Sequence, residues 1–397
     1  MREILNREEL KNRVKRLCAI ATDKYPDWDA ILIIGRINQY YLTGTMQDGL
    51  IIIKRNGTLM YFARRSYERA KKESPISECI YPMGKYSDAA EICGKQLGNV
   101  LMDTDIATIE VLDRLKVHFK INEIYPIKKI LSEVRSIKSP YELEAVKDAG
   151  KRHQYLLEEV VPNLLREGMS EVELSAELFE KMLKLGHNGV SRFNSFQTEM
   201  VIGQIAFGAN SLYPTNFDGP GGMKGLNSAV PLFGSHNALL KKGDLVFIDV
   251  AFCMEGYHSD RTQVYMFGSK PSDEILKTHR KCVEIQKRTA ALLKPNSIPS
   301  DIYSSIMSSL DSEFIENFMG FGERRVSFLG HGVGLYVDEL PVIAKGFDKP
   351  IKENMVFALE PKKGISQVGM VGGEDTYIIT PDGGECITGG GKDIISV

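Results

Sequence analysis

The stretch Leu245–Phe267 (LVFIDVAFCMEGYHSDRTQVYMF) decides the fold, because it predicts a buried β-hairpin that carries two carboxylates. Its first arm is apolar on both faces, which is typical of a strand covered on both sides. Asp249 lies in this arm, and Asp260 lies in the second arm, beyond a turn around Met254, Glu255 and Gly256. The midpoint of the two aspartates falls in the turn, so we expect their Cβ atoms to face each other about 5 Å apart. Two ionised carboxylates at that distance need a cation, a shared proton or a basic partner, and a bound metal ion is the simplest of these.

The composition is that of a globular chain with two domains. Its 397 residues exceed the size of one ordinary core, and we expect domains at residues 1–130 and 131–397. The net charge of -2 gives no electrostatic reason to expect nucleic acid or membrane as a partner. The chain starts with a charged helical pattern and has no apolar run of membrane-spanning length, so we expect a cytoplasmic protein. Its six cysteines form no CxxC pair, which favours reduced thiols.

The first domain is expected to be a small α/β domain. Helical spacing runs from Arg7 to Ala21, and an apolar strand follows at residues 30–34. The segment 38–44 (NQYYLTG) predicts a turn-rich connection. Strands at 50–54 and 58–62 flank an Asn-Gly pair, which is a strong hairpin signal. Nothing in this part carries obvious chemistry, which favours a scaffold or a dimer-forming domain.

The second domain begins with two helix start signals. Ser139-Pro140-Tyr141-Glu142 and Ser170-Glu171-Val172-Glu173 are capping boxes, and the second helix is expected to end at Gly186. After the hairpin the order repeats, with helices at about 272–293 and 300–318, a glycine-rich segment and a second pair of strands. These strands carry Glu360 and Glu374. We therefore expect an α+β domain with internal duplication, in which four carboxylates converge from two halves.

A histidine between two glycines completes the candidate site. His331 lies in the segment GHGVGL at 330–335, and alone it would indicate only a turn residue or a satisfied polar group. With four carboxylates it forms a mixed oxygen and nitrogen set that suits two divalent ions about 3.5–4 Å apart. The alternative is a salt-bridge network between the carboxylates and Arg261, Arg324 or Arg325.

In these motifs the chain resembles the pita-bread metallohydrolases, which include methionine aminopeptidase, aminopeptidase P, prolidase and the metal-free creatinase. The likeness runs from about Arg135 to the end, and it rests on Ile137-Lys138-Ser139-Pro140, Gly243-Asp244 through Ile248-Asp249, Ser259-Asp260-Arg261-Thr262, Gly330-His331-Gly332-Val333-Gly334, Leu359-Glu360-Pro361 and Glu374-Asp375-Thr376. The first domain resembles the amino-terminal domain of the creatinase and prolidase branch, best at Tyr41-Leu42-Thr43-Gly44. The resemblance implies a creatinase-like α/β domain, a pita-bread domain with a pseudo-twofold axis, and a homodimer.

The resemblance also implies a dinuclear metal peptidase of the Xaa-Pro aminopeptidase or dipeptidase type. Asp249 and Asp260 would hold one ion, His331 and Glu360 would complete the other site, and Asp260 and Glu374 would bridge the two ions. A hydroxide between the ions would attack the scissile carbonyl of a peptide. Glu360 would carry the water proton to the leaving nitrogen. The donor set suits two divalent ions of Mn, Co, Zn or Fe.

Several positions around this set depart from the family. Leu232, Ser327 and Asp338 stand where the family peptidases have histidines, and Gly372 stands where an arginine is usual. In those peptidases the histidines bind substrate carbonyls and the developing oxyanion. Asp338 is therefore a candidate general base or a partner for a substrate ammonium, unless it only caps a turn.

Candidate substrate contacts follow from the same resemblance. Tyr213 begins a segment at the place of a substrate-contacting loop, and the position of Leu232 and the side chain of Asp338 are the other candidates. His236 is a possible replacement for the histidine missing at position 232, and His258 is a possible lining residue. Both histidines fit surface or supporting positions better.

The favoured function is the Xaa-Pro peptidase, acting on peptides. The alternative is a non-peptidase hydrolase or lyase on the same fold that acts on a small amide, guanidino or onium metabolite, which the departures at Leu232, Ser327 and Asp338 support. A binding protein without catalysis is disfavoured by the five intact ligand positions. A nucleotide-binding loop at 330–334 lacks the strand-turn-helix context and the following acid that dinucleotide loops need.

Overall fold

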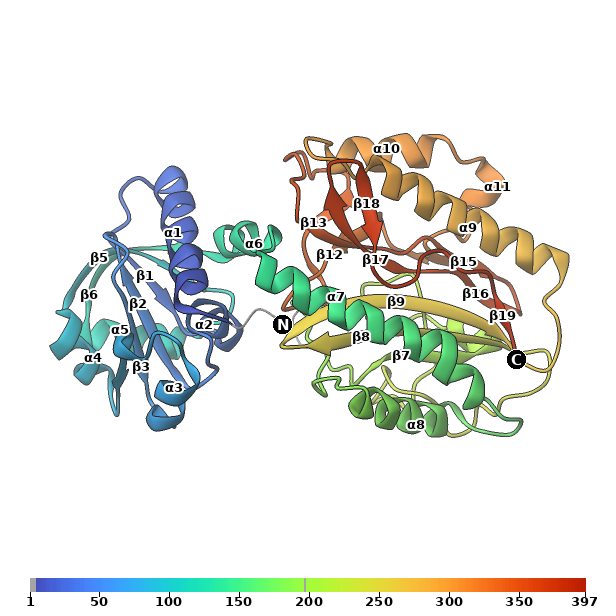
Figure 1. The fold of residues 1–397 in the computed structure, drawn as a ribbon, viewed down its shortest axis with the longest axis horizontal. Coiled ribbons are helices and arrows are strands. Elements are labelled where there is room, and N and C mark those ends of the chain that lie inside the picture. Colours follow the sequence, from blue (N-terminus) through green and yellow to red (C-terminus); the bar gives the residue numbers. More distant parts are fainter. Residues whose placement is uncertain (1–4, 196–197) are drawn as a thin grey trace. The chain divides into compact units, whose positions relative to one another are not determined.

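The computed structural model describes residues 5–195 and 198–397. It divides into two compact units, one ending at Arg135 and one beginning at Ser136, and Figure 1 shows the elements of each. None of the helices in the described residues is long and apolar enough to cross a membrane. Each unit has a sheet system and a hydrophobic core of its own.

The first unit contains a six-stranded mixed sheet in the order β4-β3-β2-β1-β5-β6. Its strands are β1 (Ala30–Ile33), β2 (Gly49–Lys54), β3 (Leu59–Ala63), β4 (Ile80–Pro82), β5 (Gln96–Met102) and β6 (Lys120–Pro126). Its helices are α1 (Arg7–Lys24), α2 (Arg36–Thr43), α3 (Tyr67–Glu73), α4 (Tyr86–Cys93), α5 (Ile109–His118) and α6 (Lys128–Ser136), the last at the boundary. The predicted helix, strand and hairpin at its start are confirmed, with β2 and β3 paired across Asn56-Gly57.

The prediction of a turn-rich connection at 38–44 is wrong, because this segment lies in helix α2. Tyr41 and Leu42 are fully buried, and burial overrides the weak helix propensity of the Tyr-Tyr-Leu-Thr run. Gly44 ends the helix in the left-handed conformation, with φ of 75°.

The second unit repeats one order of elements. Its helices are α7 (Pro140–Tyr155), α8 (Glu171–Lys184), α9 (Asp273–Leu292), α10 (Pro299–Ser308) and α11 (Ser312–Ile315). Its strands are β7 (Gly203–Phe207), β8 (Leu245–Met254), β9 (Tyr257–Met266), β10 (Gly320–Phe321), β11 (Arg324–Arg325), β12 (Phe328–Gly332), β13 (Glu339–Ala344), β14 (Val356–Leu359), β15 (Lys362–Ile365), β16 (Gly369–Gly372), β17 (Asp375–Thr380), β18 (Gly383–Cys386) and β19 (Ile395–Ser396). Two helices followed by strands thus occur twice, as predicted, but the second half adds the short helix α11 after α10.

Two sheets of this unit meet where the carboxylates lie. One sheet has the order β19-β9-β8-β7 and packs against α7, and the other has the order β13-β12-β14-β17-β18 and packs against α9 and α10 (Figure 1). A bridge between Thr262 of β9 and Glu374, just before β17, joins them. The two halves therefore bring their acidic residues to one seam.

The predicted helix starts are confirmed, but the predicted length of one helix is not. Ser139 and Ser170 both form the predicted capping boxes, with Glu142 and Glu173. The single helix predicted at 300–318 is wrong, because α10 ends at Ser308 and Asp311 caps the separate helix α11. Serine hydroxyls at the end of α10 bond back to helix carbonyls, and such bonds compete with helix continuation.

Candidate metal centre

A tight turn sets the register of the β8–β9 hairpin. Glu255 and Gly256 have φ of 51° and 83°, so they form a two-residue turn with both positive φ values that matches the twist of the strands. Met254 consequently pairs with Tyr257. The hairpin is buried on both faces along nearly its whole length, as its apolar pattern predicts.

This register corrects the predicted position of the two aspartates. Asp249 pairs with Thr262 and Asp260 pairs with Ala251, so the aspartates are not directly opposite. The prediction that they face each other is wrong, because the turn lies one position further along than the midpoint of the two residues. They are diagonal neighbours on one face of the hairpin, which still lets both side chains contribute to one site.

His331 lies in strand β12 between two glycines, which allow the neighbouring strand to approach closely. A Cβ atom on Gly330 would lie 2.2 Å from the carbonyl oxygen of Ala358 on β14, so only glycine fits there. The His331 Nδ1 atom lies 3.1 Å from the carbonyl oxygen of Gly332, and we assign its proton to that hydrogen bond. The Nε2 atom then faces the carboxylates, and it can bind a metal ion after it has released its own proton.

Glu360 and Glu374 lie at matching breaks in two strands. Glu360 falls between β14 and β15, and Glu374 falls between β16 and β17. β14 pairs with β17 in one sheet, whereas β15 pairs with β16 in another. The two segments of the chain therefore pass from one sheet to the other at Glu360 and at Glu374. The two glutamates leave the ladder at the change and point to the same place as the hairpin aspartates.

The five predicted ligands converge in two groups that share one glutamate. Ligand atoms of Asp260, His331 and Glu374 lie within 4.8 Å of one another, and so do those of Asp249, Glu360 and Glu374. Within the described part of the chain, the Glu374 Oε1 atom is buried without a hydrogen-bond partner, 3.7 Å from His331 Nε2. An unpartnered carboxylate oxygen beside an imidazole nitrogen fits a divalent ion at this first group, once that nitrogen has released its proton.

A lysine that the sequence analysis missed occupies the second group. The Lys362 Nζ atom lies 3.0 Å from Asp249 Oδ2, 2.8 Å from Glu360 Oε2 and 2.7 Å from Glu374 Oε2. Its side chain is fully buried. The signal was present in the sequence, since Lys362 follows Glu360 by two positions and in an extended chain such residues share a face.

The charges in the cluster shift one another's protonation. Burial opposes a charge on His331, but a hydrogen bond to Glu360 and the charges of Glu360, Glu374 and Asp260 outweigh it and raise the pKa of His331 to about 10. Loss of hydration raises the pKa values of Asp249, Asp260 and Glu374. The metal-free cluster therefore holds protons that a metal ion must displace.

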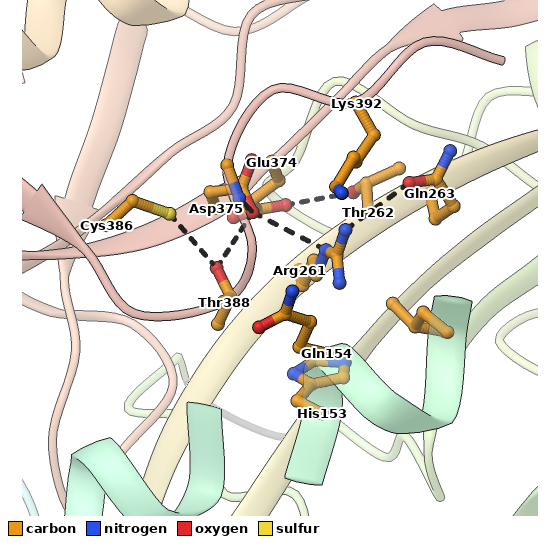
Figure 2. Close-up of polar contacts among 12 residues, drawn as sticks. His153, Gln154, Arg261, Thr262, Gln263, Glu374, Asp375, Cys386, Thr388 and Lys392 are labelled. Atoms are coloured by element: carbon orange, nitrogen blue, oxygen red, sulfur yellow. Dashed lines mark hydrogen bonds and ion pairs between the residues drawn. The ribbon is translucent and has the colours of Figure 1, made fainter. Parts of the chain in front are cut away.

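The predicted salt-bridge alternative names the wrong cations. Figure 2 shows that Arg261 turns toward Gln263 and Asp375, and its Nε atom lies 3.4 Å from Asp375 Oδ1. Arg324 donates to the carbonyl oxygen of Phe217. On the other side of the hairpin strand, the Thr262 hydroxyl donates to Glu374 Oε2 at 3.1 Å and fixes that carboxylate (Figure 2).

The cluster forms part of the wall of a cavity of about 530 Å³. All five predicted ligands line it, together with Ser327 and Asp338 from the departing positions. Its other lining residues include the aromatic side chains of Phe193, Phe217, Phe328 and Phe347. A small, partly apolar cavity with a cluster of ligand-type groups is the usual form of a catalytic site.

Asp338 holds a loop at the rim of this cavity. Its Oδ1 atom accepts a hydrogen bond from the backbone N–H of Asn194, and its Oδ2 atom accepts bonds from the N–H and hydroxyl of Ser195 at 3.1 Å and 3.0 Å. Burial raises the pKa of the Asp338 carboxyl. These contacts support the interpretation that Asp338 positions the loop at 193–195.

Two candidate substrate contacts and two candidate histidines are not among the described residues that line the cavity. Tyr213 is exposed to solvent, and Leu232 packs in a small apolar cluster with Met223. His236 is exposed. His258 is fully buried and its Nδ1 atom lies 3.0 Å from the carbonyl oxygen of Gly334, so it has a structural role.

Fold and site together define a two-domain protein whose second domain carries a buried set of metal-ligand side chains in a cavity. Residues 144–381 match the metallopeptidase family M24, and residues 13–137 match the creatinase/prolidase N-terminal domain. The chain therefore belongs to metallopeptidase family M24, in the two-domain form that carries a creatinase-type first domain.

Similar proteins cover nearly the whole chain. An Xaa-Pro dipeptidase of Pyrococcus furiosus is 27% identical over 96% of this chain and 98% of its own length. The crystal structure of the prolidase from Pyrococcus horikoshii has 25% identity and a TM-score of 0.74, covering 95% of this chain and 98% of that one. The crystal structure of an X-Pro aminopeptidase from Thermotoga maritima has 23% identity and a TM-score of 0.76. The match covers 97% of this chain and 100% of that one, and it shows the same fold.

Proposed function

We propose that the protein is a metal-dependent peptidase of the Xaa-Pro dipeptidase or aminopeptidase type. The observation that carries the proposal is the convergence of Asp249, Asp260, His331, Glu360 and Glu374 on one wall of the cavity. Membership of family M24 and full-length similarity to proteins named Xaa-Pro dipeptidase support it.

The metal-holding residues are three of the five predicted ligands. Asp260, His331 and Glu374 provide two carboxylates and an imidazole, with Glu360 beside them, and this donor set suits Mn, Co, Zn or Fe. A divalent ion bound there supplies Lewis-acid activation of water and of the scissile carbonyl. The predicted pair of ions meets an obstacle in Lys362, which contacts the same carboxylates as a second ion would.

Proton transfer falls to Glu360. Its Oε2 atom accepts a hydrogen bond from Lys362, while its Oε1 atom faces His331 Nε2 at 3.5 Å and the residue lines the cavity. The carboxylate is anchored through one oxygen, and when His331 Nε2 binds an ion instead of facing Glu360, the other oxygen can take a proton from water and pass it to the leaving nitrogen. Asp338 contributes by fixing the loop at 193–195 against the substrate.

The apolar side of the cavity suits a proline ring. Phe193 and Phe217 pack edge to face, with ring centroids 5.2 Å apart, and both line the cavity. A proline residue next to the scissile bond presents an apolar ring without an N–H group, so an aromatic wall binds it without leaving a donor unpaired.

The test uses the purified protein loaded separately with Mn, Co and Zn. Xaa-Pro dipeptides and longer Xaa-Pro peptides are offered, with matched Xaa-Ala peptides as the control, and released amino acids are measured. We expect cleavage that prefers the proline peptides and that stops on chelation. Metal-loaded protein that cleaves none of these peptides would contradict the proposal.

A second candidate function is a non-peptidase hydrolase or lyase that acts on a small amide, guanidino or onium metabolite. The observation that favours it is the acidic side of the cavity, where Asp218, Asp338 and Glu339 line the wall. Cationic small molecules in the same assay, followed by product analysis, separate the two functions. A cytoplasmic location and a homodimer stay predictions.

A further inference from the structure

The ammonium group of Lys362 lies at the centre of one of the two ligand groups. Its three carboxylate partners, at 2.7–3.0 Å, are Asp249, Glu360 and Glu374. The same three residues form the second group of atoms close enough to hold a metal ion. The lysine and a second ion therefore require the same carboxylates.

Two cations cannot use this group at once. A divalent ion of the expected kinds binds carboxylate oxygens at about 2.0–2.2 Å, so it would lie among the three oxygens where Nζ now lies. An ammonium placed beside it would face a doubly charged neighbour in a buried place, where repulsion is strong. Binding of a second ion would thus require Lys362 to leave its three partners.

The surroundings of Lys362 keep it in place. The side chain has no exposed surface, and its Nζ atom lies 5.9 Å from the centre of the Phe247 ring. Its backbone pairs with Gly372 across β15 and β16, so closely that a Cβ on Gly372 would lie 2.7 Å from the Lys362 Cα atom. Gly372 is the position at which the resemblance implies an arginine, so here the positive charge stands on the opposite strand.

The other ligand group remains open to an ion. His331 Nε2 and the unpartnered Glu374 Oε1 atom are 3.7 Å apart, and Asp260 Oδ2 is 4.0 Å from the same nitrogen. All three residues line the cavity, whereas Lys362 is not found among the described lining residues. A substrate in the cavity would meet this group and not the ammonium.

We propose that the centre holds one divalent ion, at Asp260, His331 and Glu374, and that the Lys362 ammonium permanently takes the place of the second ion. The proposal rests on the metal-dependent function proposed above and specifies its metal count. Lys362 acts as a positioning residue, because it fixes Asp249, Glu360 and Glu374 without touching the substrate.

The test counts the ions in the full-length protein. Wild type, Lys362→Met and Lys363→Met are dialysed against excess Mn²⁺, passed through a desalting column and analysed for metal per chain. Lys363 is the matched control, because it is the next residue of β15 and its Nζ atom instead contacts the carbonyl oxygen of Phe314, at 2.9 Å. We expect about one ion in wild type and in the control, and about two in Lys362→Met.

Two ions in wild type, or one ion in Lys362→Met, would overturn the proposal. The first of these results would mean that the lysine only replaces the charge of the arginine missing at position 372. The count is independent of peptide cleavage. One ion without peptidase activity would support the proposal that Lys362 replaces the second ion and would contradict the proposed function. Two ions with peptidase activity would contradict the proposal about Lys362 and support the proposed function.

A spectroscopic measurement on wild type covers the case in which Lys362→Met fails to fold. Two Mn²⁺ ions about 3.5–4 Å apart are magnetically coupled through shared ligands. We expect the electron paramagnetic resonance spectrum of Mn-loaded wild type to be that of an isolated Mn²⁺ ion. The broadened spectrum of a coupled pair would contradict the proposal.

Discussion

At the scale of single residues, the site depends on which atoms each ligand leaves free. Asp260 shows this separation well, because its backbone N–H and carbonyl both bond to the Thr376 hydroxyl at 2.8 Å while its carboxylate is left for the cluster. The fold therefore uses the main chain of Asp260, and the candidate metal centre uses its side chain.

Substitution Asp260→Asn should remove bound metal and leave the fold intact. The amide keeps the shape of the side chain but loses its negative charge. Loss of a residue that only supports a metal ligand lowers metal affinity by up to about 100-fold, so we expect loss of a ligand to lower the affinity for Mn²⁺ by more than ~100-fold. Metal content and circular dichroism check this. Asp218→Asn, at an acid that lines the cavity outside the cluster, is the control, and full metal retention in Asp260→Asn would refute the ligand assignment.

Metal affinity should fall as pH falls. Without metal, His331 carries a proton at any pH below its pKa of about 10, and binding must release that proton. Linkage then predicts a loss of about tenfold in affinity for each unit of pH lost between about pH 8 and pH 6. Titration calorimetry in two buffers of different ionisation enthalpy counts the protons released, and an affinity that does not change with pH would show that His331 is not a ligand.

At the scale of elements, the candidate ligands are placed by close strand packing and by strand breaks. β12 lies between β13 and β14, and its glycines allow the approach. β14 ends just before Glu360, and β17 begins just after Glu374, so both glutamates lie outside the ladder. The position of His331 is thus a property of the sheet around it.

Substitution Gly330→Ala should weaken both stability and metal binding. The new Cβ would lie 2.2 Å from the Ala358 carbonyl oxygen, so β12 must shift, at a cost of about 1–3 kcal/mol of unfolding free energy. Gly373→Ala is the control, because its Cβ would come no closer than 3.7 Å to the Thr262 carbonyl oxygen. Thermal unfolding and Mn²⁺ titration measure both effects, and equal behaviour of the two variants would disprove the packing argument.

Substitution Asp338→Ala should raise KM while leaving kcat and metal content nearly unchanged. The change removes hydrogen bonds to a charged acceptor that hold Asn194 and Ser195 at the cavity, each worth about 1.5–3 kcal/mol. We expect KM to rise about tenfold. A fall of about 100-fold in kcat with KM unchanged would instead identify Asp338 as a general base.

At the scale of the whole molecule, two halves of the second unit share one seam. The backbone N–H of Thr262 on β9 donates to the Glu374 carbonyl oxygen at 3.2 Å, which ties the first sheet to the second at the cluster. The ligands come from both halves, so the site exists only when both have folded. All five lie beyond Ser136, in the second unit.

Much of this arrangement could be predicted from the sequence. Asp249 and Asp260 in an apolar hairpin, and the capping boxes at Ser139 and Ser170, are local patterns that the structure preserves. The spacing of Lys362 from Glu360 puts both on one face of an extended chain, but it does not identify the other two carboxylates that the ammonium contacts, because these depend on where β14 ends and β15 begins. The aspartate register depended on the conformation of one turn, which hydrophobic pattern does not determine.

The position of a bound ion in the whole protein tests the central claim most directly. Crystals of the full chain soaked in Mn²⁺ give an anomalous difference map at the manganese edge. We predict a peak about 2.0–2.3 Å from ligand atoms of Asp260, His331 and Glu374, with Lys362 still among its three carboxylates. A map without a peak at these residues would contradict the account.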